Sequence, residues 1–431
     1  MEIIKLGAII KELTDTFDFY SDYKNQNYLA KSLQFSEGKR SSIEIIPQYS
    51  LQKRLRPLFG KNGLNLPSIG NHPDFNYLAG TNLQEYNHTV TLFMDIENST
   101  RLNILFTPEK VQKIKNAFIC TAIEIIKTFD GHVHRIMGDA VMAFFGGKET
   151  DEFDDIINAL NCGTILQYFS KTVIKPRLNF TDYPFGIRVG LDFGPKEKVL
   201  WSSYGYFNMN EVTATSFYVD VASKLQHQAG RNNVMIGDSL KNYCDLPEDI
   251  IDTKTNSKGE KDYYLVPNIT DVENKPIYYK KYLFNWEKYL NLSIIPQYEE
   301  SIKKQDDNNL PISITSYVHA EEEGKFLYRY FPLSKVIEKD KSIRFKIDLS
   351  KDIEFPYNLK FIVENHGAEA KSRGGDNYGN HETIYEITKI NSLDKLTHWE
   401  HTAYKGLHYM KVHLIKDGVL KNQSKFGVYI K

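Results

Sequence analysis

The stretch that decides the fold begins with TLFMDIENSTRL at residues 91–102 and ends with HVHRIMGDAVMAFFGG at residues 132–147. Residues 90–94 form an apolar run that predicts a buried strand, and Asp95 follows this run directly. Asp139 belongs to a Gly-Asp pair between two apolar runs, which is a strong signal for a hairpin turn. Between these pieces, residues 107–129 carry apolar side chains at helical spacing. The order strand, helix, hairpin therefore places two carboxylates in one compact unit.

Two converging carboxylates are typical of a site for a pair of divalent cations. Two such ions about 4 Å apart can activate an attacking oxygen and hold a triphosphate. Taken alone, an Asp after a strand is more often a cap, and a Gly-Asp pair between strands is more often only a turn. The two motifs in this order favour the metal site.

Composition indicates a soluble globular protein of two or three domains. The chain has 431 residues, of which 41% are hydrophobic and 25% charged. The net charge of −1 gives no sign of nucleic-acid binding. Cys120, Cys162 and Cys244 fit neither a zinc spacing nor a disulfide framework, so we expect a reducing cytoplasm. No apolar run approaches the ~20 residues that span a bilayer, and the N-terminus predicts an amphipathic helix packed on the core or on a partner.

Local composition and hydrophobic pattern divide the chain into segments. Residues 1–85 predict a helical N-terminal lead segment. Residues 86–267 alternate strands and helices, which is typical of an α+β sheet with helices on one face. Residues 268–309 predict a helical linker that ends in a polar break. Residues 310–431 contain about seven short runs that alternate apolar and polar residues, and they predict an all-β, immunoglobulin-like sandwich.

MDIENSTRL, a helix and HRIMGDAVMAFFGG together resemble the class III nucleotide cyclases. The pattern of that family is DIxGST or DIxGFT, followed by a strand ending in Gly-Asp, a hydrophobic residue and Met-Ala. The resemblance covers about residues 90–238. It implies a ferredoxin-like catalytic domain whose sites form between two subunits of a homodimer. Metal ligands then come from one subunit, and base-reading and transition-state residues from the other.

The resemblance implies that Asp95 and Asp139 bind two Mn²⁺ or Mg²⁺ ions, with the Ile96 carbonyl as a further donor, because these hard cations prefer oxygen ligands. One ion would lower the pKa of the ribose 3′-hydroxyl, and the other would hold the β- and γ-phosphates. Ser99 and Thr100 precede a predicted helix start, whose backbone N–H groups are candidates for phosphate contact. The alternative is that these two residues only cap the helix.

Arg135 and Thr213 are the candidate readers of the base. Arg135 lies four residues before Asp139, where purine-using members of the family commonly carry Lys or Glu. Thr213 lies seven residues before Asp220, at the second base-reading position, although the intervening turn TSFY lacks the usual Gly of the family. Arg only donates hydrogen bonds and reaches farther than Lys. A longer donor suits a smaller base in a purine-sized pocket, so we expect a pyrimidine, with uracil narrowly ahead of cytosine.

The second half of the catalytic unit departs from the family pattern. Where cyclases have VN-x-A-x-R, this chain has VDVASK, so Asp220 replaces an Asn that orients the ribose and Lys224 replaces an Arg that stabilises the phosphates. Asp220 accepts but does not donate hydrogen bonds, and Lys224 lacks the bidentate fork. Both remain catalytic candidates. Arg231 and Lys241 are alternative sources of the cation.

Two further features have structural interpretations. His132 and His134 alternate on one predicted strand but have no third ligand at useful spacing, so we interpret them as structural and not as zinc ligands. The acidic run ETDEFDD at residues 149–155 predicts a solvated helix N-terminus, where negative charge is favoured.

EHTAYKGLHYMKVHLIKDGV at residues 400–419 resembles the C-terminal sensor domain of bacterial cyclases and nucleotide synthetases in phage defence. Joined to Arg135, this domain resembles the pyrimidine cyclases of bacterial Pycsar defence. The first hypothesis is therefore a cytoplasmic uridylate or cytidylate cyclase whose product acts on a separate effector, expected at a membrane. One alternative is an adenylate cyclase, which Thr213 fits and Arg135 fits less well. A second is a nucleotide-binding module without turnover, which Asp220 and Lys224 motivate.

Overall fold

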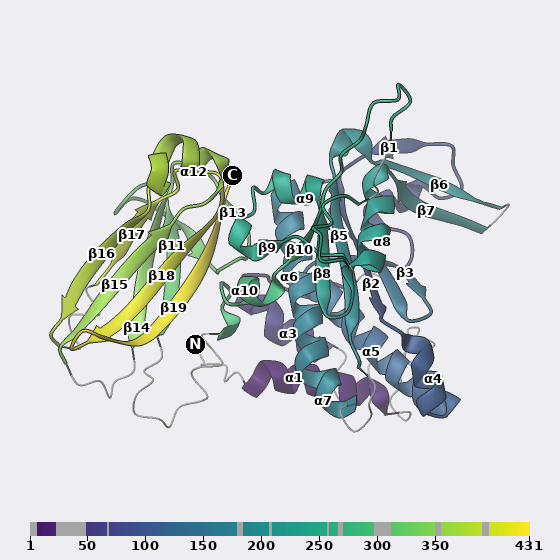
Figure 1. Ribbon diagram of the computed structural model, residues 1–431, viewed down its shortest axis with the longest axis horizontal. Helices are drawn as coiled ribbons and strands as arrows, with labels where there is room; N and C mark the ends of the chain where they lie inside the picture. Colours follow the sequence, from purple (N-terminus) through teal and green to yellow (C-terminus); the bar gives the residue numbers. More distant parts are fainter. Residues whose placement is uncertain are drawn as a thin grey trace, which may run out of the picture.

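The computed structural model describes ten segments of the chain: residues 7–22, 49–66, 69–178, 184–206, 209–256, 258–265, 270–296, 312–349, 355–389 and 396–431. These segments form a mixed α/β part and a β-rich C-terminal part that lie side by side (Figure 1). Two parts of these kinds agree with the predicted division into an α+β and an all-β region.

A seven-stranded sheet with the order β3-β4-β2-β5-β8-β10-β9, here called the main sheet, forms the centre of the α/β part. Its β2, β3, β4 and β5 pair antiparallel, whereas β8 pairs parallel with β5. Along the chain these elements follow as β2 (Thr89–Ile96), α5 (Pro108–Thr128), β3 (His132–Met137), β4 (Ala140–Phe145), α6 (Glu152–Phe169), β5 (Ile187–Gly194) and β8 (Asn233–Gly237). The predicted strand, helix and hairpin are confirmed.

Helices cover both faces of the main sheet, so the expectation of one covered face is wrong. Gly163 of α6 packs over the side chain of Leu191 on one face of β5. On the opposite face, α8 (Phe217–Ala229) lies so close to Gly190 that an added Cβ would come within 2.2 Å of the backbone nitrogen of Gln226. Successive strand residues point to opposite faces, and therefore the missing side chain at Gly190 makes room for α8.

The N-terminal helix α1 (Gly7–Ser21) packs on the core, as its amphipathic pattern predicts. Its buried side chains recur at helical spacing and face α5: Ile9, Leu13, Phe17 and Tyr20. Helix α3 (Ser50–Leu55) joins this contact. Gln52 of α3 and Tyr20 of α1 both bond to the buried carboxyl group of Glu124, at 3.3 and 3.5 Å.

A second sheet of three strands covers part of the main sheet. It consists of β1 (Gln84–Tyr86), β6 (Leu200–Tyr206) and β7 (Met209–Thr215). Trp201 and Val212 of this sheet pack with Phe144 of β4 in one apolar cluster. The outer part of the β6–β7 hairpin projects from the molecule (Figure 1), where Tyr206 is 70% exposed.

The main sheet extends into the region predicted as a helical linker. After β8 come α9 (Asp238–Tyr243) and β9 (Ile251–Asp252), and then β10 (Lys281–Phe284) pairs with both β8 and β9. Residues 268–309 therefore include a strand of this sheet as well as the short helix α10 (Trp286–Leu290). The remaining short helices are η2 (Arg56–Phe59), η3 (Pro73–Leu78), η4 (Ser99–Arg101), α4 (Leu102–Leu105), η5 (Ser170–Ile174), α7 (Lys175–Leu178), η6 (Lys196–Lys198) and η7 (Glu248–Ile250).

The C-terminal part is a sandwich of two sheets. One has the order β12-β11-β14-β17 and the other β13-β19-β18-β15-β16, and both contribute to one buried apolar cluster. Their strands are β11 (Ile312–His319), β12 (Phe326–Tyr330), β13 (Val336–Ile337), β14 (Ser342–Leu349), β15 (Tyr357–Glu364), β16 (His381–Ile387), β17 (His398–His401), β18 (Gly406–Lys416) and β19 (Val419–Ile430). Helix α12 (Gly367–Gly374) and η8 (Gly375–Asn377) connect β15 to β16. The alternating pattern therefore predicted a sandwich correctly.

The two parts share one continuous hydrophobic core. Leu333, Leu407 and Tyr429 of the sandwich belong to the same buried cluster as the helices of the α/β part. Polar contacts cross the boundary as well: Asn161 of α6 donates to the Leu333 carbonyl at 2.7 Å. Tyr429 also donates to the hydroxyl of Tyr289, which follows β10, at 3.3 Å.

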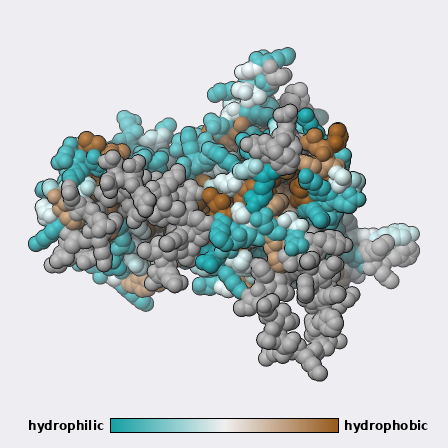
Figure 2. Space-filling model, turned by 90° about the horizontal axis from the view of Figure 1, so that it is seen from below, coloured by the Kyte–Doolittle hydropathy of each residue, from teal (hydrophilic) through white to brown (hydrophobic). Residues whose placement is uncertain are grey.

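Figure 2 shows one face of the molecule, on which small brown hydrophobic patches are separated by hydrophilic surface. Apolar side chains exposed in small groups are ordinary for a globular protein. Among the described residues, no helix combines the length and the apolar character needed to cross a bilayer.

Candidate active site

The sheet register brings Asp95 and Asp139 to the same edge of the main sheet. Asp95 pairs with Ala140 across β2 and β4, and Asp139 is the residue before Ala140 in the β3–β4 turn. Gly138 has φ +69°, a left-handed conformation that favours glycine and lets the turn close tightly. The side chains of Asp95 and Asp139 are 18% and 24% exposed. The structure therefore gathers the two carboxylates that the sequence predicted.

Arg188 faces this pair and was missed by the sequence analysis. It lies directly opposite Asp95 on β5, and its Nε donates to Asp95 Oδ1 at 2.9 Å while Nη2 donates to Oδ2 at 2.5 Å. Hydrogen bonding to Asp95 raises the pKa of Arg188. A guanidinium fork binds phosphate as well as carboxylate. The sequence offers one clue to Arg188: it is the one cation in the apolar run IRVGLDFG, whose other residues are all buried.

A second cation, Lys115 of α5, lies on the other side of the pair. Its Nζ is 3.8 Å from Asp139 Oδ1 and donates to Ser99 Oγ at 3.2 Å. Ser99 is buried in the first turn of η4, and Thr100 beside it is exposed. Two carboxylates, two cations and a hydroxyl thus meet at one edge, which is the electrostatic setting that a metal-bound triphosphate requires.

The donor set fits hard divalent cations. Within the described residues, no three His, Cys, Asp or Glu side chains gather as metal ligands. The candidates at this edge are the carboxylates of Asp95 and Asp139 and the Ile96 carbonyl. Mg²⁺ is commonly held by one or two carboxylates together with substrate phosphates. This set therefore fits ions that arrive with a nucleotide better than a closed protein cage.

Arg135 is held by Glu211, a residue of β7 that sequence reasoning also missed. Arg135 Nε donates to Glu211 Oε2 at 2.9 Å, and Nη2 donates to Oε1. Burial by itself would raise the pKa of Glu211, but Arg135 and His134 hold it below its ordinary value. The sequence offers one clue to Glu211: it lies two residues before Thr213, and alternate residues of a strand share one face, so both lie on the same face of β7. Thr213 itself is buried.

His132 and His134 have structural partners, as interpreted from the sequence. His132 Nε2 and His134 Nδ1 lie 2.8 and 3.0 Å from the carbonyl oxygen of Gly70. The β3–β4 register shifts between Val133 and Arg135, so His134 occupies a β-bulge.

Asp220 and Lys224 lie on α8, whose first turn is remote from the carboxylate pair. Both are exposed and one helical turn apart on α8, so they share one face of the helix. The C-terminal end of α8 reaches Arg188, which lies 3.5 Å from the His227 carbonyl, whereas its first turn lies beside Gly194 at the other end of β5. Asp220 therefore lies towards the sheet end remote from Asp95.

Of the two alternative cations, only Arg231 lies near the carboxylate pair. Its Nε is 2.8 Å from Glu97 Oε2, two residues beyond Asp95. Lys241 pairs with Glu248 at 2.9 Å. It belongs to α9, which follows the opposite end of β8.

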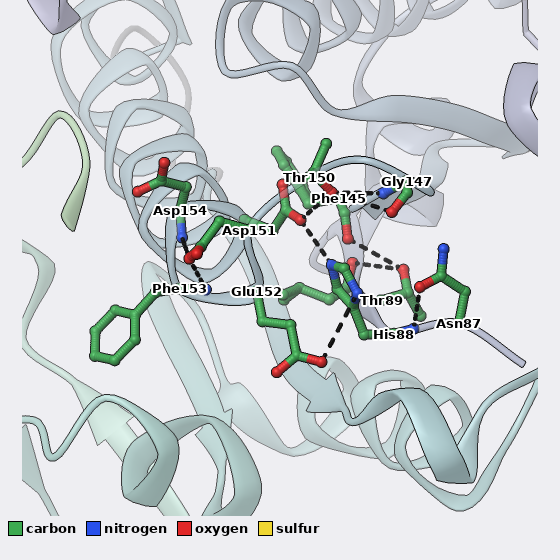
Figure 3. A network of polar contacts seen from close by, with 12 residues as sticks. Asn87, His88, Thr89, Phe145, Gly147, Thr150, Asp151, Glu152, Phe153 and Asp154 are labelled. Atoms are coloured by element: carbon green, nitrogen blue, oxygen red, sulfur yellow. Dashed lines mark hydrogen bonds and ion pairs between the residues drawn. The ribbon is translucent and has the colours of Figure 1, made fainter. Parts of the chain in front are cut away.

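The acidic run 149–155 forms the N-terminus of α6, as predicted, with Asp151 as N-cap. It is a contact region, however, so the prediction that it is solvated is wrong. Figure 3 shows residues 150–154 of this run at the start of α6, with Glu152 close to His88, the residue before β2. Asp155 is buried and lies 2.8 Å from His88 Nε2, while Thr150 donates to it at 2.6 Å. Asp154 accepts from the Val336 backbone N–H of the sandwich at 2.7 Å. Tertiary contacts thus take up charges that the sequence pattern assigns to solvent.

Known proteins resemble this chain over nearly its whole length. A protein named cytidylate cyclase from Escherichia coli is 36% identical, over 97% of this chain and 91% of its own. A cytidylate cyclase from Staphylococcus aureus is 36% identical, over 94% of this chain and 93% of its own. The chain is a nucleotide cyclase of their family.

Residues 285–431 of this nucleotide cyclase match the family described as the Adenylyl/Guanylyl and SMODS C-terminal sensor domain. The match includes α10 and the whole sandwich. It begins at residue 285, before residue 310, at which the sequence pattern predicts the start of the C-terminal domain. Among solved structures, the adenylyl cyclase CyaB of Pseudomonas aeruginosa aligns with 47% of this chain and 95% of its own, with a TM-score of 0.38 and 18% identity.

Proposed function

We propose that this nucleotide cyclase converts CTP to 3′,5′-cyclic CMP and pyrophosphate. The observation that carries the proposal is the Asp95–Ala140 register, which sets Asp95 beside Asp139 between the cations Arg188 and Lys115. The names of the relatives support cytosine. The narrow preference for uracil in the sequence analysis has no support from them.

Asp95, Asp139 and the Ile96 carbonyl would hold two Mg²⁺ or Mn²⁺ ions, which when bound acidify the ribose 3′-hydroxyl and neutralise phosphate charge. When the nucleotide binds, Arg188 transfers one of its two hydrogen bonds from Asp95 to the triphosphate. This is possible because carboxylate and phosphate oxygens accept from the same guanidinium N–H groups. Lys115 and the backbone at Ser99 and Thr100 are placed for further phosphate contact.

In the reaction, the 3′-oxygen forms a bond to the α-phosphorus, and the bond from that phosphorus to the β-bridging oxygen breaks. The proton of the 3′-hydroxyl leaves to solvent or phosphate, and pyrophosphate departs with the electron pair. Arg188 and Lys115 stabilise the negative charge that accumulates on the leaving group. Asp220 and Lys224 are proposed to contact the ribose and phosphates.

We propose a homodimer, because α8 places Asp220 away from Asp95 within one chain. A two-fold contact would supply Asp220 and Lys224 from the partner subunit and create two equal sites. Exposed apolar side chains lie on the elements that such a contact would use: Ile136, Met137, Tyr204, Tyr206 and Phe217. The βαββαβ order from β2 to β5 supports the ferredoxin-like assignment.

The name of the matched C-terminal family supports a sensing role for the sandwich. We propose that the cyclase works in the cytoplasm, in anti-phage signalling, through a separate effector that binds the cyclic nucleotide. We propose a division into a lead segment (1–85), a catalytic domain (86–267), a linker (268–309) and a sensor domain (310–431), in which the linker contributes β10 to the main sheet.

The test is a product assay on the full-length protein with Mn²⁺ and, separately, CTP, UTP, ATP and GTP. We expect cyclic CMP as the main product. Asp139→Asn should reduce its formation at least 100-fold, because one metal ligand loses its charge. Asp417→Asn, in the remote β18–β19 turn, is the matched control and should keep full activity. A main product from UTP, ATP or GTP, or the absence of product with all four nucleotides, would contradict the proposal.

A further inference from the structure

Glu211 gathers donors from two consecutive residues of β3. His134 Nε2 lies 2.7 Å from Glu211 Oε1, and Arg135 reaches both carboxylate oxygens. Consecutive strand residues ordinarily point to opposite faces. Here the β-bulge at His134 turns both side chains towards one carboxylate. The bulge therefore serves the contact with Glu211.

The hydrogen bonds hold the side chains of this cluster in place. His134 Nδ1 faces the Gly70 carbonyl and Nε2 faces the carboxylate of Glu211. Arg135 and His134 hold the pKa of Glu211 below its ordinary value, against the effect of burial. The two hydrogen bonds from Arg135 to this carboxylate fix the orientation of the guanidinium group.

The cluster presents a recognition edge. Arg135 spends its Nε–H and one Nη2–H on Glu211 and has a further hydrogen bond with Tyr204. A guanidinium group has five N–H donors, so Arg135 keeps others for a ligand. The carboxylate of Glu211 keeps lone pairs beside them. The side chains of Arg135 and Glu211 are 38% and 34% exposed, so a ligand can reach them. Tyr204 lies directly opposite Glu211 on β6 and is 54% exposed, and it offers an aromatic face for base stacking.

This edge matches cytosine better than uracil. Cytosine offers two neighbouring acceptors, O2 and N3, and then the N4 amino donor. A guanidinium fork can donate to the two acceptors, and carboxylates commonly accept from cytosine N4. Uracil has a donor, N3–H, between two acceptors, O2 and O4. Its N3–H would face an N–H donor of Arg135, and its O4 carbonyl would face the Glu211 carboxylate, which only accepts.

We infer that Glu211 is the residue that selects cytosine, by accepting the N4 amino group while it fixes Arg135 against O2 and N3. The inference rests on the proposed function and adds a base-reading residue to it. The role assigned to Thr213 from the sequence then becomes secondary, because Thr213 is buried while Glu211 is accessible.

The experiment compares kcat/KM for CTP and UTP in the full-length protein and in Glu211→Gln. The new amide has almost the same size but presents a donor as well as an acceptor, so it can serve either base. We expect the CTP:UTP ratio to fall about tenfold or more. Glu197→Gln removes the same charge from the exposed η6 turn, and it should leave the ratio unchanged.

Glu211→Asp is the second variant. It keeps the charged acceptor on a shorter stem, so we expect a raised KM for CTP with the cytosine preference retained. Melting temperatures of all variants report whether they fold. If the wild type makes cyclic CMP and Glu211→Gln keeps its CTP:UTP ratio within twofold, the role of Glu211 is refuted and the proposed function stands. If the wild type makes no cyclic CMP, the proposed function itself fails.

Discussion

Glu124 offers a quantitative test of how the N-terminal helices are held on α5. The residue is 5% exposed, and its carboxyl group accepts hydrogen bonds from Gln52 and Tyr20. Burial raises the pKa of Glu124 from 4.5 to about 7, against the opposing effect of Gln52. The folded state therefore binds this proton more tightly than the unfolded state.

The sign and size of the effect follow from linkage. Because the folded-state pKa is raised, the contribution of Glu124 is complete below pH 4.5 and is lost as the pH rises through about 7. The pKa shift is about 2.5 units, and each unit corresponds to about 1.4 kcal/mol. Above pH 8 the ionised carboxylate therefore lowers the free energy of unfolding by about 3 kcal/mol. At pH 5 only about 1 kcal/mol of this destabilisation has developed.

Glu124→Gln replaces the titrating carboxyl by an amide that can keep both hydrogen bonds. We expect the variant to exceed the wild type in free energy of unfolding by about 3 kcal/mol at pH 8 and by about 1 kcal/mol at pH 5. Urea denaturation at the two pH values measures this difference. Glu109→Gln, at the exposed start of the same helix, should show no such gain. A difference between variant and wild type that is the same at pH 5 and pH 8 would refute the reasoning.

Two further predictions concern the site and the sheet. Arg188→Lys should lower kcat/KM for CTP about 100-fold, because the ammonium cannot form the fork that binds carboxylate and phosphate; an unchanged steady-state rate would remove Arg188 from the mechanism. Gly190→Ala should lower the melting temperature markedly, because its methyl group would meet the α8 backbone at 2.2 Å; a melting temperature equal to that of the wild type would mean that α8 does not lie against β5 as described.

The sequence predicted the parts of the fold that depend on local pattern. Strand β2 and the β3–β4 hairpin follow from apolar runs and a Gly-Asp turn. The approach of Asp95 to Asp139 follows from the order of these elements and appears in the register as the pairing of Asp95 with Ala140. Partners from other strands were not predictable in this way. Arg188 and Glu211 are isolated charged residues, and only the register and the bulge bring them to Asp95 and Arg135.

Charge density in the sequence was a misleading guide to exposure. Run 149–155 has the composition of a solvated helix start, yet Asp155 is 4% exposed and Asp154 bonds to the sandwich. Its partners, His88 and the backbone of Val336, are distant in sequence. Single-sequence reasoning has no means of finding such pairs, because neither spacing nor periodicity encodes them.

The shared core that joins the sandwich to the α/β part limits how these enzymes can be rearranged. Leu333, Leu407 and Tyr429 fill space among the helices of the other part, so cutting the chain near residue 310 would leave that space open to water. The C-terminal part is thus not an exchangeable module. A hybrid enzyme that joined the sandwich of a relative to this α/β part would need side chains that fill the same space in the shared core.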